Sequence, residues 1–326
     1  MKKILLLLVS LLIGSALFVW LGKVVGWKEI KQSFSLFNYW EGLVILGLSF
    51  LIALIGNWRW HEILKDQGVK ISFIELLKSF LAGYALMFLA PIIFLSGEFF
   101  RAYILKEKNA VAWQKGMSSV IIDRILEWTA NLFFIFLGGL IFYFVIGFPP
   151  FKIGIIIGLT FLVFVIGMLF IYFKYRKGET IVGFFIKSRK NQPLETEKEI
   201  FKYFKADNPA IWKGLGISFL RALVMYFRAW FLILFLGVKI SAWPVISLLG
   251  FTYLAALIPI PTSLGSHEAL QIFAFGSLGL KVSIATAFTL IIRAAELIVS
   301  SIGVIILLRL GIFLVRKALN ASDNRN

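Results

Sequence analysis

Cysteine is missing from this sequence, and histidine is scarce. The chain of 326 residues has no Cys and two His. The lack of cysteine excludes disulfides, cysteine-bound metals and thiol nucleophiles. The two histidines, His61 and His267, lie far apart in the sequence and do not make a metal site. The sequence also lacks a phosphate-binding loop, a nucleotide fingerprint and a nucleophile–base motif. We therefore expect no catalytic residue, no metal, no cofactor and no enzymatic activity.

Hydrophobic residues, in contrast, dominate the chain. They make up 60% of it, and the mean hydropathy is +0.90, whereas a soluble globular protein is about 45–50% apolar. A helix needs about 20 apolar residues to cross a bilayer core about 30 Å thick. The chain has room for several such helices, but not for a soluble domain of about 50–200 residues between them. The composition predicts an all-α polytopic membrane protein, which we expect in the cytoplasmic membrane.

Acidic residues are few, 17 against 34 Lys and Arg, and the formal net charge is +17. The basic residues lie between the apolar segments. A basic excess in that position is typical of cytoplasmic loops and of contact with anionic lipid headgroups. We therefore expect an anionic membrane lipid as the partner, and no nucleic acid.

The apolar segments differ in length. Segments 97–107, 242–258 and 267–279 are too short to span comfortably. The two shortest follow breaks rich in proline or small residues, at 91–97 and 259–266. The first segment is expected to be a retained helix rather than a cleaved signal peptide. The apolar segments lie near 4–22, 41–62, 73–90, 97–107, 117–147, 151–173, 212–236, 242–258, 267–279 and 283–308.

The distribution of basic residues predicts the topology. Lys2 and Lys3 place the N-terminus in the cytoplasm, and the basic stretch 174–211 and the basic C-terminal tail belong there too. These assignments agree only if 73–107 enters and leaves from the cytoplasm, and if 242–279 enters and leaves from outside. The sequence thus predicts six full spans and two broken re-entrant hairpins, N-in and C-in. Backbone at membrane depth must be buried in protein or line a wet cavity, so the two hairpin tips are predicted to face each other or a cavity.

Polar landmarks recur along the chain at an offset of 169 or 170 residues. Residues 1–150 are predicted to form a first membrane repeat, and residues 151–326 a second, inverted repeat that includes the loop 174–211. Inverted repeats are common in transporters, where substrates bind near the midplane at the ends of broken helices. The alternative is an old duplication with two purely structural copies. The matched pairs are Arg59 with Arg228, Pro91 with Pro261, Ser96 with Ser266, Glu98 with Glu268, Arg124 with Arg293, and Glu127 with Glu296.

The two hairpin tips carry candidate binding residues. Ser96 and Ser266 are expected to cap the returning half-helices, whose N-termini favour an anion such as phosphate. Glu98 and Glu268 fall in the first turns, where each either satisfies local N–H groups or forms a proton or headgroup-amine site. His267 either relays protons to Glu268 or makes a hydrogen bond at the tip.

Further charged residues lie within or near the apolar spans. A charge at the bilayer centre costs at least about 2.5–3.5 kcal/mol, so such residues normally face the protein interior and pair. Arg124 with Glu127, and Arg293 with Glu296, are three apart and share a helix face. They are either structural ion pairs or part of a polar path that compensates a lipid phosphate. The other candidates for this path are Arg59, Arg101, Asp123, Arg221 and Arg228.

Four sequence motifs resemble a known family. Residues 97–105 (GEFFRAYIL) and 123–127 (DRILE) resemble the first half of the lysylphosphatidylglycerol synthase transmembrane family, also called flippase-like. Residues 259–268 (PIPTSLGSHE) and 293–296 (RAAE) resemble its second half. The second tip has Thr and Ser where the family usually has more glycine. The resemblance covers nearly the whole chain.

The resemblance implies a flippase-like membrane domain, but not its substrate, because other members are linked to lipid-linked sugars. The charged residues lead us to expect that the chain binds or translocates an anionic lipid, either aminoacylated or polyisoprenyl-linked. In the multiple peptide resistance factor this domain accompanies an aminoacyltransferase, a domain that we do not expect in this chain. Two alternatives stay open. One is a membrane enzyme that acts on a lipid phosphate, with Asp123, Glu98 or His267 as acid or base. The other is an accessory subunit of a separate glycosyl- or aminoacyltransferase. The protein partner is then expected to be such a transferase, or a second copy of the chain in a homo-oligomer.

Overall fold

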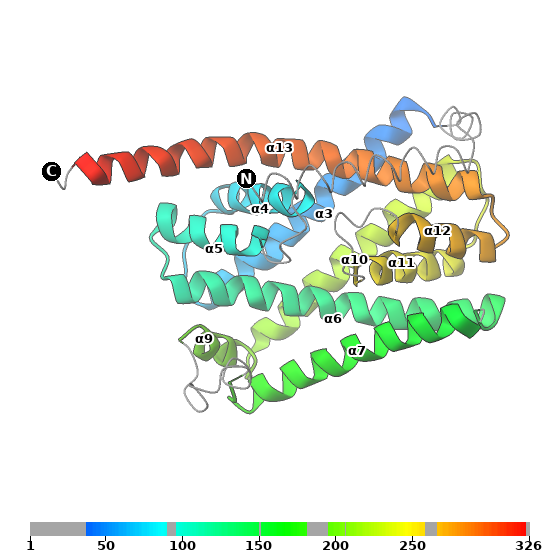
Figure 1. Ribbon diagram of the computed structural model, residues 1–326, viewed down its shortest axis with the longest axis horizontal. Helices are drawn as coiled ribbons and strands as arrows, with labels where there is room; N and C mark the ends of the chain where they lie inside the picture. The colour runs from blue at the N-terminus through cyan, green and yellow to red at the C-terminus, as the bar shows by residue number, and fades with distance from the viewer. Residues whose placement is uncertain are drawn as a thin grey trace. The chain divides into compact units, whose positions relative to one another are not determined.

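The computed structural model describes residues 37–89, 96–149, 151–180, 195–205, 207–257 and 266–323, and all regular structure in these ranges is α-helical (Figure 1). The predicted first span at 4–22 and the two hairpin tips lie outside the described residues. The helices are α3 (Tyr39–Asp66), α4 (Phe73–Leu89), α5 (Ser96–Asn109), α6 (Trp113–Ile146), α7 (Phe151–Arg176), α9 (Glu195–Tyr203), α10 (Pro209–Phe235), α11 (Ala242–Leu257), α12 (Ser266–Ser277) and α13 (Val282–Asp323).

Five of the described helices are long and apolar enough to cross a membrane: α3, α6, α7, α10 and α13. They coincide with the predicted spans at 41–62, 117–147, 151–173, 212–236 and 283–308. The all-helical class and the presence of several apolar helices confirm the coarse prediction of a multi-pass membrane protein. The number of spans and the N-in, C-in topology stay predictions.

The short helices pack in pairs, α4 against α5 and α11 against α12 (Figure 1). Helices α5 and α12 have 14 and 12 residues. At 1.5 Å per residue they reach only about 21 and 18 Å, which is less than the hydrocarbon thickness. Each pair falls where a re-entrant hairpin is predicted, at 73–107 and 242–279. The pairing of the helices is observed, whereas their entry into the membrane from one side stays a prediction.

Local hydrogen bonds explain where several helices begin. The Ser72 Oγ accepts a hydrogen bond from the Glu75 N–H at 3.3 Å at the start of α4, in the Ser-x-x-Glu pattern of a capping box. At the start of α10, the Asn208 Oδ1 accepts a hydrogen bond from the Ala210 N–H at 2.9 Å. Pro209 occupies the first helical position, where its missing N–H leaves no donor unpaired. These starts are therefore encoded locally.

The described chain divides into two compact units, each drawing on both predicted repeats. Unit 1 comprises residues 1–52, 127–169 and 219–296. Unit 2 comprises residues 53–126, 170–218 and 297–326. Helices α3, α6, α7, α10 and α13 thus contribute one part to each unit. The predicted boundary at residue 150 concerns the sequence repeats, and it stays a prediction.

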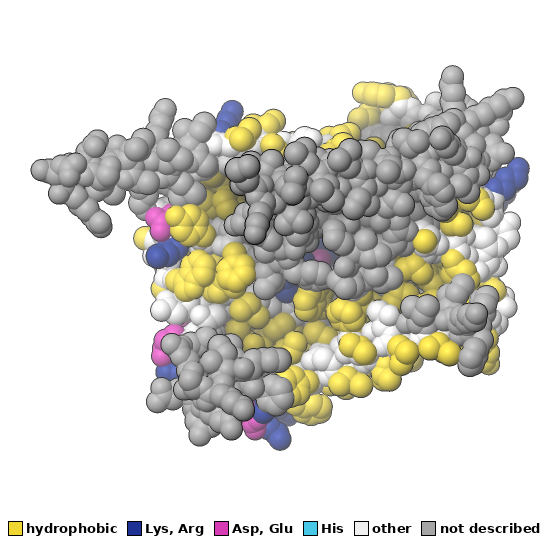
Figure 2. Space-filling model, viewed as in Figure 1, with side chains coloured by type: hydrophobic (Ala, Val, Ile, Leu, Met, Phe, Trp, Pro, Cys, Tyr) yellow, Lys and Arg dark blue, Asp and Glu magenta, His cyan; other side chains and the backbone are white. Residues whose placement is uncertain are grey.

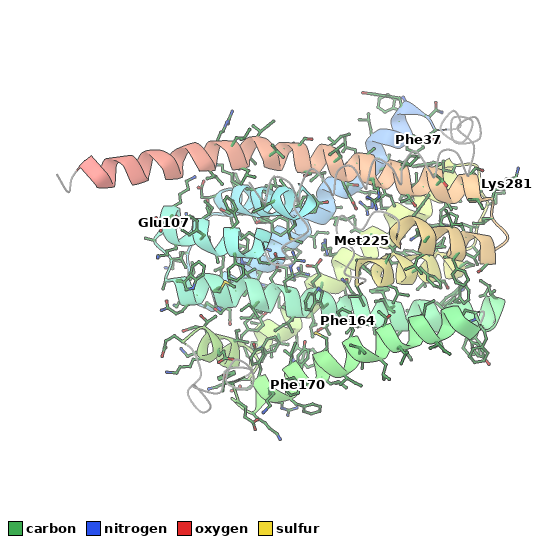
Figure 3. All side chains as sticks on the ribbon, viewed as in Figure 1. Phe37, Glu107, Phe164, Phe170, Met225 and Lys281 are labelled. Carbon is green, nitrogen blue, oxygen red and sulfur yellow. The ribbon has the colours of Figure 1, made fainter. Side chains whose placement is uncertain are left out.

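Helix α7 is far less buried than the other candidate spans. Only 6% of its apolar window is buried, against 44% for α10. Figure 2 shows apolar side chains along this helix, and Leu159, Val163 and Ile166 are each more than half exposed. On the unit 1 part of α7, the Phe164 ring meets Trp128 of α6 edge to face, with 6.5 Å between centroids (Figure 3). A long apolar surface of this kind suits hydrocarbon as the surrounding solvent.

Candidate functional site

Ten of the charged residues predicted from the sequence to form the site are described, five in each unit. Arg59 is on α3, Glu98 and Arg101 are on α5, and Asp123 and Arg124 are on α6, all within unit 2. Unit 1 holds Glu127 on α6, Arg221 and Arg228 on α10, and Arg293 and Glu296 on α13. We call the first five residues the unit 2 cluster.

Asp123 binds two arginines at the centre of the unit 2 cluster. Its Oδ1 accepts a hydrogen bond from Arg59 Nε at 2.6 Å. Its Oδ2 accepts two hydrogen bonds from the guanidinium of Arg101, both at 3.1 Å. All three side chains are at most 2% exposed. The carboxylate therefore joins α3, α5 and α6, and its loss would leave two buried cations.

Aromatic rings fix the position of Arg101 further. Its guanidinium carbon lies 3.9 Å from the ring centroid of Trp60 and 4.8 Å from that of Phe80. Contacts this close are cation–π interactions. The Trp60 indole N–H in turn donates a hydrogen bond to the Ser119 Oγ at 3.0 Å. The Arg101 guanidinium is thus held by Asp123, Trp60 and Phe80, which leaves it little freedom to contact a ligand.

Arg124 and Glu98 form the more open part of the unit 2 cluster. The Arg124 Nε lies 2.5 Å from the Glu98 Oε1, and the Arg124 side chain is 20% exposed against 3% for Glu98. Arg124 Nη2 also donates to the Met87 sulfur of α4 at 3.0 Å, and a thioether is a weak acceptor. The Glu98 Oε2 is buried and accepts no hydrogen bond from the described residues. The Glu98 carboxylate thus has one buried oxygen that takes no hydrogen bond from the described part of the chain.

Unit 1 holds two ion pairs between helices. Arg221 of α10 pairs with Glu127 of α6. Arg228 donates to the Glu296 Oε1 of α13 at 3.2 Å and to the Ser49 Oγ of α3 at 3.0 Å. Each glutamate therefore has a partner on another helix. The predicted pairs within α6 and within α13 stay predictions, and Arg293 is partly buried on α13.

Two arginine–serine hydrogen bonds join matched positions of the two predicted repeats. Arg59 donates to the Ser218 Oγ at 3.1 Å, just as Arg228 donates to that of Ser49. Ser218 lies 169 positions after Ser49, the same separation as Arg228 from Arg59. Each arginine thus takes its serine from the other predicted repeat. Neither serine was predicted from the sequence, although the common offset of 169 residues marks both of them.

Two close contacts between helices also join matched positions of the two predicted repeats. A β-carbon on Gly250 of α11 would lie 3.0 Å from the backbone oxygen of Phe134 in α6. A β-carbon on Gly303 of α13 would lie 2.2 Å from that of Leu81 in α4. Gly303 follows Phe134 by 169 positions, as Gly250 follows Leu81. Only glycine allows these backbones to approach so closely.

The hairpin ends agree with part of the prediction. Ser96 and Ser266 are the first residues of α5 and α12, and Glu98 lies in the first turn of α5. The side chains of Ser96, Ser266, His267 and Glu268 lie outside the described residues, so their capping and binding roles stay predictions. In the described part of α12, the Gln271 amide donates to the Thr252 Oγ1 of α11 at 2.6 Å.

Comparison with known proteins covers almost the whole chain. The family model for the lysylphosphatidylglycerol synthase TM region matches residues 7–303. A UPF0104 membrane protein of Methanocaldococcus jannaschii is 27% identical over an alignment of 322 positions, and the match covers 92% of each chain. A second UPF0104 membrane protein, from Methanothermobacter thermautotrophicus, is 22% identical over 301 residues, covering 86% of this chain and 88% of that one. The chain therefore belongs to the lysylphosphatidylglycerol synthase TM region family of membrane proteins, as its sequence motifs predicted.

Proposed function

We propose that this protein binds an anionic lipid within the cytoplasmic membrane and moves it between the leaflets, as a flippase-like transporter. The unit 2 cluster is the observation that carries this proposal. It contains three arginines and two carboxylates, so one positive charge is in excess. Charged residues inside membrane helices are costly and normally serve a pathway or a ligand. An excess of buried arginine favours an anion, and arginine suits the oxygen atoms of a phosphate group.

A lipid is the favoured source of that anion because of where the cluster lies. Arg59 and Arg124 belong to α3 and α6, which are candidate membrane spans. A headgroup entering from the bilayer would reach these helices while its acyl chains stayed in hydrocarbon. Membership of the lysylphosphatidylglycerol synthase TM region family supports a role in lipid handling.

The inverted-repeat arrangement is part of the same proposal. We infer that α4 and α5 enter from the cytoplasm and that α11 and α12 enter from outside, in an N-in, C-in chain. The crossed arginine–serine bonds and the two matching glycine contacts support a twofold relation between the repeats. Transporters built on inverted repeats bind their substrates at broken helices near the midplane.

Lipid movement by the purified full-length chain tests the proposal. The protein is reconstituted into vesicles that contain phosphatidylglycerol or lysyl-phosphatidylglycerol with a fluorescent acyl chain, and a membrane-impermeant reductant bleaches the outer leaflet. We expect faster loss of inner-leaflet fluorescence than in protein-free vesicles, and slower loss for Arg124→Ala. The matched control is Lys78→Ala, which removes an exposed, paired cation from α4 in the same unit.

Three results would contradict lipid movement. Protein-free rates for both lipids would refute it directly. Covalently altered lipid, found by mass spectrometry of the vesicle extract, would instead favour an enzyme acting on the lipid phosphate. If lipid movement is seen only when a glycosyl- or aminoacyltransferase co-purifies, the protein is better described as an accessory subunit.

A further inference from the structure

The three arginines of the unit 2 cluster are not equally able to meet a ligand. Arg59 and Arg101 are at most 2% exposed, and both bind Asp123. Arg101 is also covered by the Trp60 ring. The Arg124 side chain is 20% exposed, and one of its donors is directed at a thioether. An anion that reaches this cluster would therefore meet Arg124 first.

Glu98 stands in the way of such an anion. Its Oε1 lies 2.5 Å from the Arg124 Nε, so a phosphate that takes donors from this guanidinium comes close to the glutamate. A carboxylate and a phosphate that share one guanidinium repel each other, and such like-charged pairs hold a proton. A phosphodiester is the stronger acid, so the carboxyl group takes the proton. The Glu98 Oε2 is buried and accepts no hydrogen bond from the described residues, so a proton at this oxygen displaces no such bond.

We propose that Arg124 is the residue that binds the phosphate and that Glu98 takes up one proton when a phosphodiester headgroup binds. The inference rests on the proposed function, and it adds a proton-linked binding step. The proton comes from solvent and attaches to the Glu98 carboxylate, which then carries no negative charge beside the phosphate. No covalent bond of the lipid forms or breaks. Arg124 then exchanges its internal carboxylate partner for the lipid phosphate.

The other charged groups around Glu98 do not compete for this role. Asp123 on α6 is occupied by Arg59 of α3 and by Arg101 of α5, the helix that carries Glu98. The charges of α4, Glu75 and Lys78, lie near Lys108 at the far end of α5. Helix α13 packs on α4 and α5 through Leu310, and its nearby cation, Arg309, is exposed.

Calorimetric titration of the full chain with phosphatidylglycerol tests the proposal, because this headgroup does not itself titrate near neutral pH. The heat of binding is measured at pH 8 in two buffers that differ in their ionisation enthalpy, which gives the number of protons taken up. We expect about one proton for the wild type. The dissociation constant should rise about tenfold per pH unit wherever binding takes up one proton.

Substitutions separate Glu98 from other groups that could titrate. Glu98→Gln resembles the protonated carboxyl, so it should bind at pH 8 more tightly than the wild type, with no proton uptake and a flat pH profile. Glu62→Gln is the matched control, since Glu62 pairs with an exposed Lys213 in the same unit. It should keep the wild-type proton uptake. Arg124→Lys should weaken binding at every pH.

The outcomes distinguish this inference from the proposed function. If the wild type binds no phosphatidylglycerol at any pH, the proposed function fails. If the wild type binds the lipid without proton uptake, or if Glu98→Gln keeps the full uptake, then Glu98 does not take up the proton. The inference about Glu98 and Arg124 fails in that case, while the proposed function stands. The proton count of the wild type needs no variant, so it stays decisive even if Glu98→Gln does not fold.

Discussion

Replacing Asp123 with asparagine tests the central contact of the unit 2 cluster. Asp123 accepts one hydrogen bond from Arg59 and two from Arg101, while both arginines are nearly inaccessible to solvent. Asparagine keeps one acceptor oxygen, but it turns an NH₂ group toward a guanidinium and removes the negative charge. Removing one partner of a buried ion pair typically costs about 3–5 kcal/mol, because the remaining charge is uncompensated.

Thermal unfolding in a mild detergent measures this loss. With about 2–4 °C per kcal/mol, the midpoint should fall by roughly 6–20 °C for Asp123→Asn. Glu62→Gln breaks a partly exposed pair with Lys213, and such pairs contribute about 0–1 kcal/mol, so its midpoint should hardly move. If Asp123→Asn unfolded within about 2 °C of this control, the arginines would not depend on Asp123 for their charge balance.

Two further predictions concern contacts of α4. Gly303→Ala would place a β-carbon against the Leu81 backbone oxygen, so it should destabilise the protein by about 1–3 kcal/mol in the same thermal assay. The control is Gly167→Ala, which has open space around it and should be neutral or stabilising. Equal unfolding midpoints for the two variants would contradict the close approach of α13 and α4. Hydrogen bonds, with that from Lys108 the largest cause, hold the pKa of the Glu75 carboxyl below its usual range. This pair therefore stabilises α4 against α5 above the usual carboxyl pKa, and the effect is lost as pH falls through the lowered value. The protection of amides at the end of α5, measured relative to their intrinsic exchange rate at each pH, should fall in acid for the wild type. It should vary less with pH for Glu75→Gln.

The helices could be predicted from the sequence because their signal is local. The apolar run 117–147 became α6 (Trp113–Ile146), and the break before residue 97 became the start of α5 (Ser96–Asn109). Segment length and hydrophobicity suffice for these elements, since a span is defined by about 20 apolar residues. The small shifts at the ends come from polar residues, such as Gln114 and Lys115, that continue a helix beyond its apolar part.

The partners of the buried charges could not be predicted in the same way. Helical spacing shows only which residues share a face of one helix, so it proposed Arg124 with Glu127. The structure adds a partner for Glu127 on α10, Arg221, which is 94 positions away. The Met87 sulfur beside Arg124 gave no sequence signal, because a methionine in an apolar run is usually a packing residue.

The crossed arginine–serine bonds bear on how such a chain could have arisen. Half of the sequence, expressed alone, would carry Arg59 and Ser49 but neither Arg228 nor Ser218, so its buried arginine would lack the hydroxyl that it now binds. Two copies of that half, inserted in opposite orientations, could restore both contacts at once. Because both halves lie in one chain, the buried arginine of each half has its serine at a fixed stoichiometry.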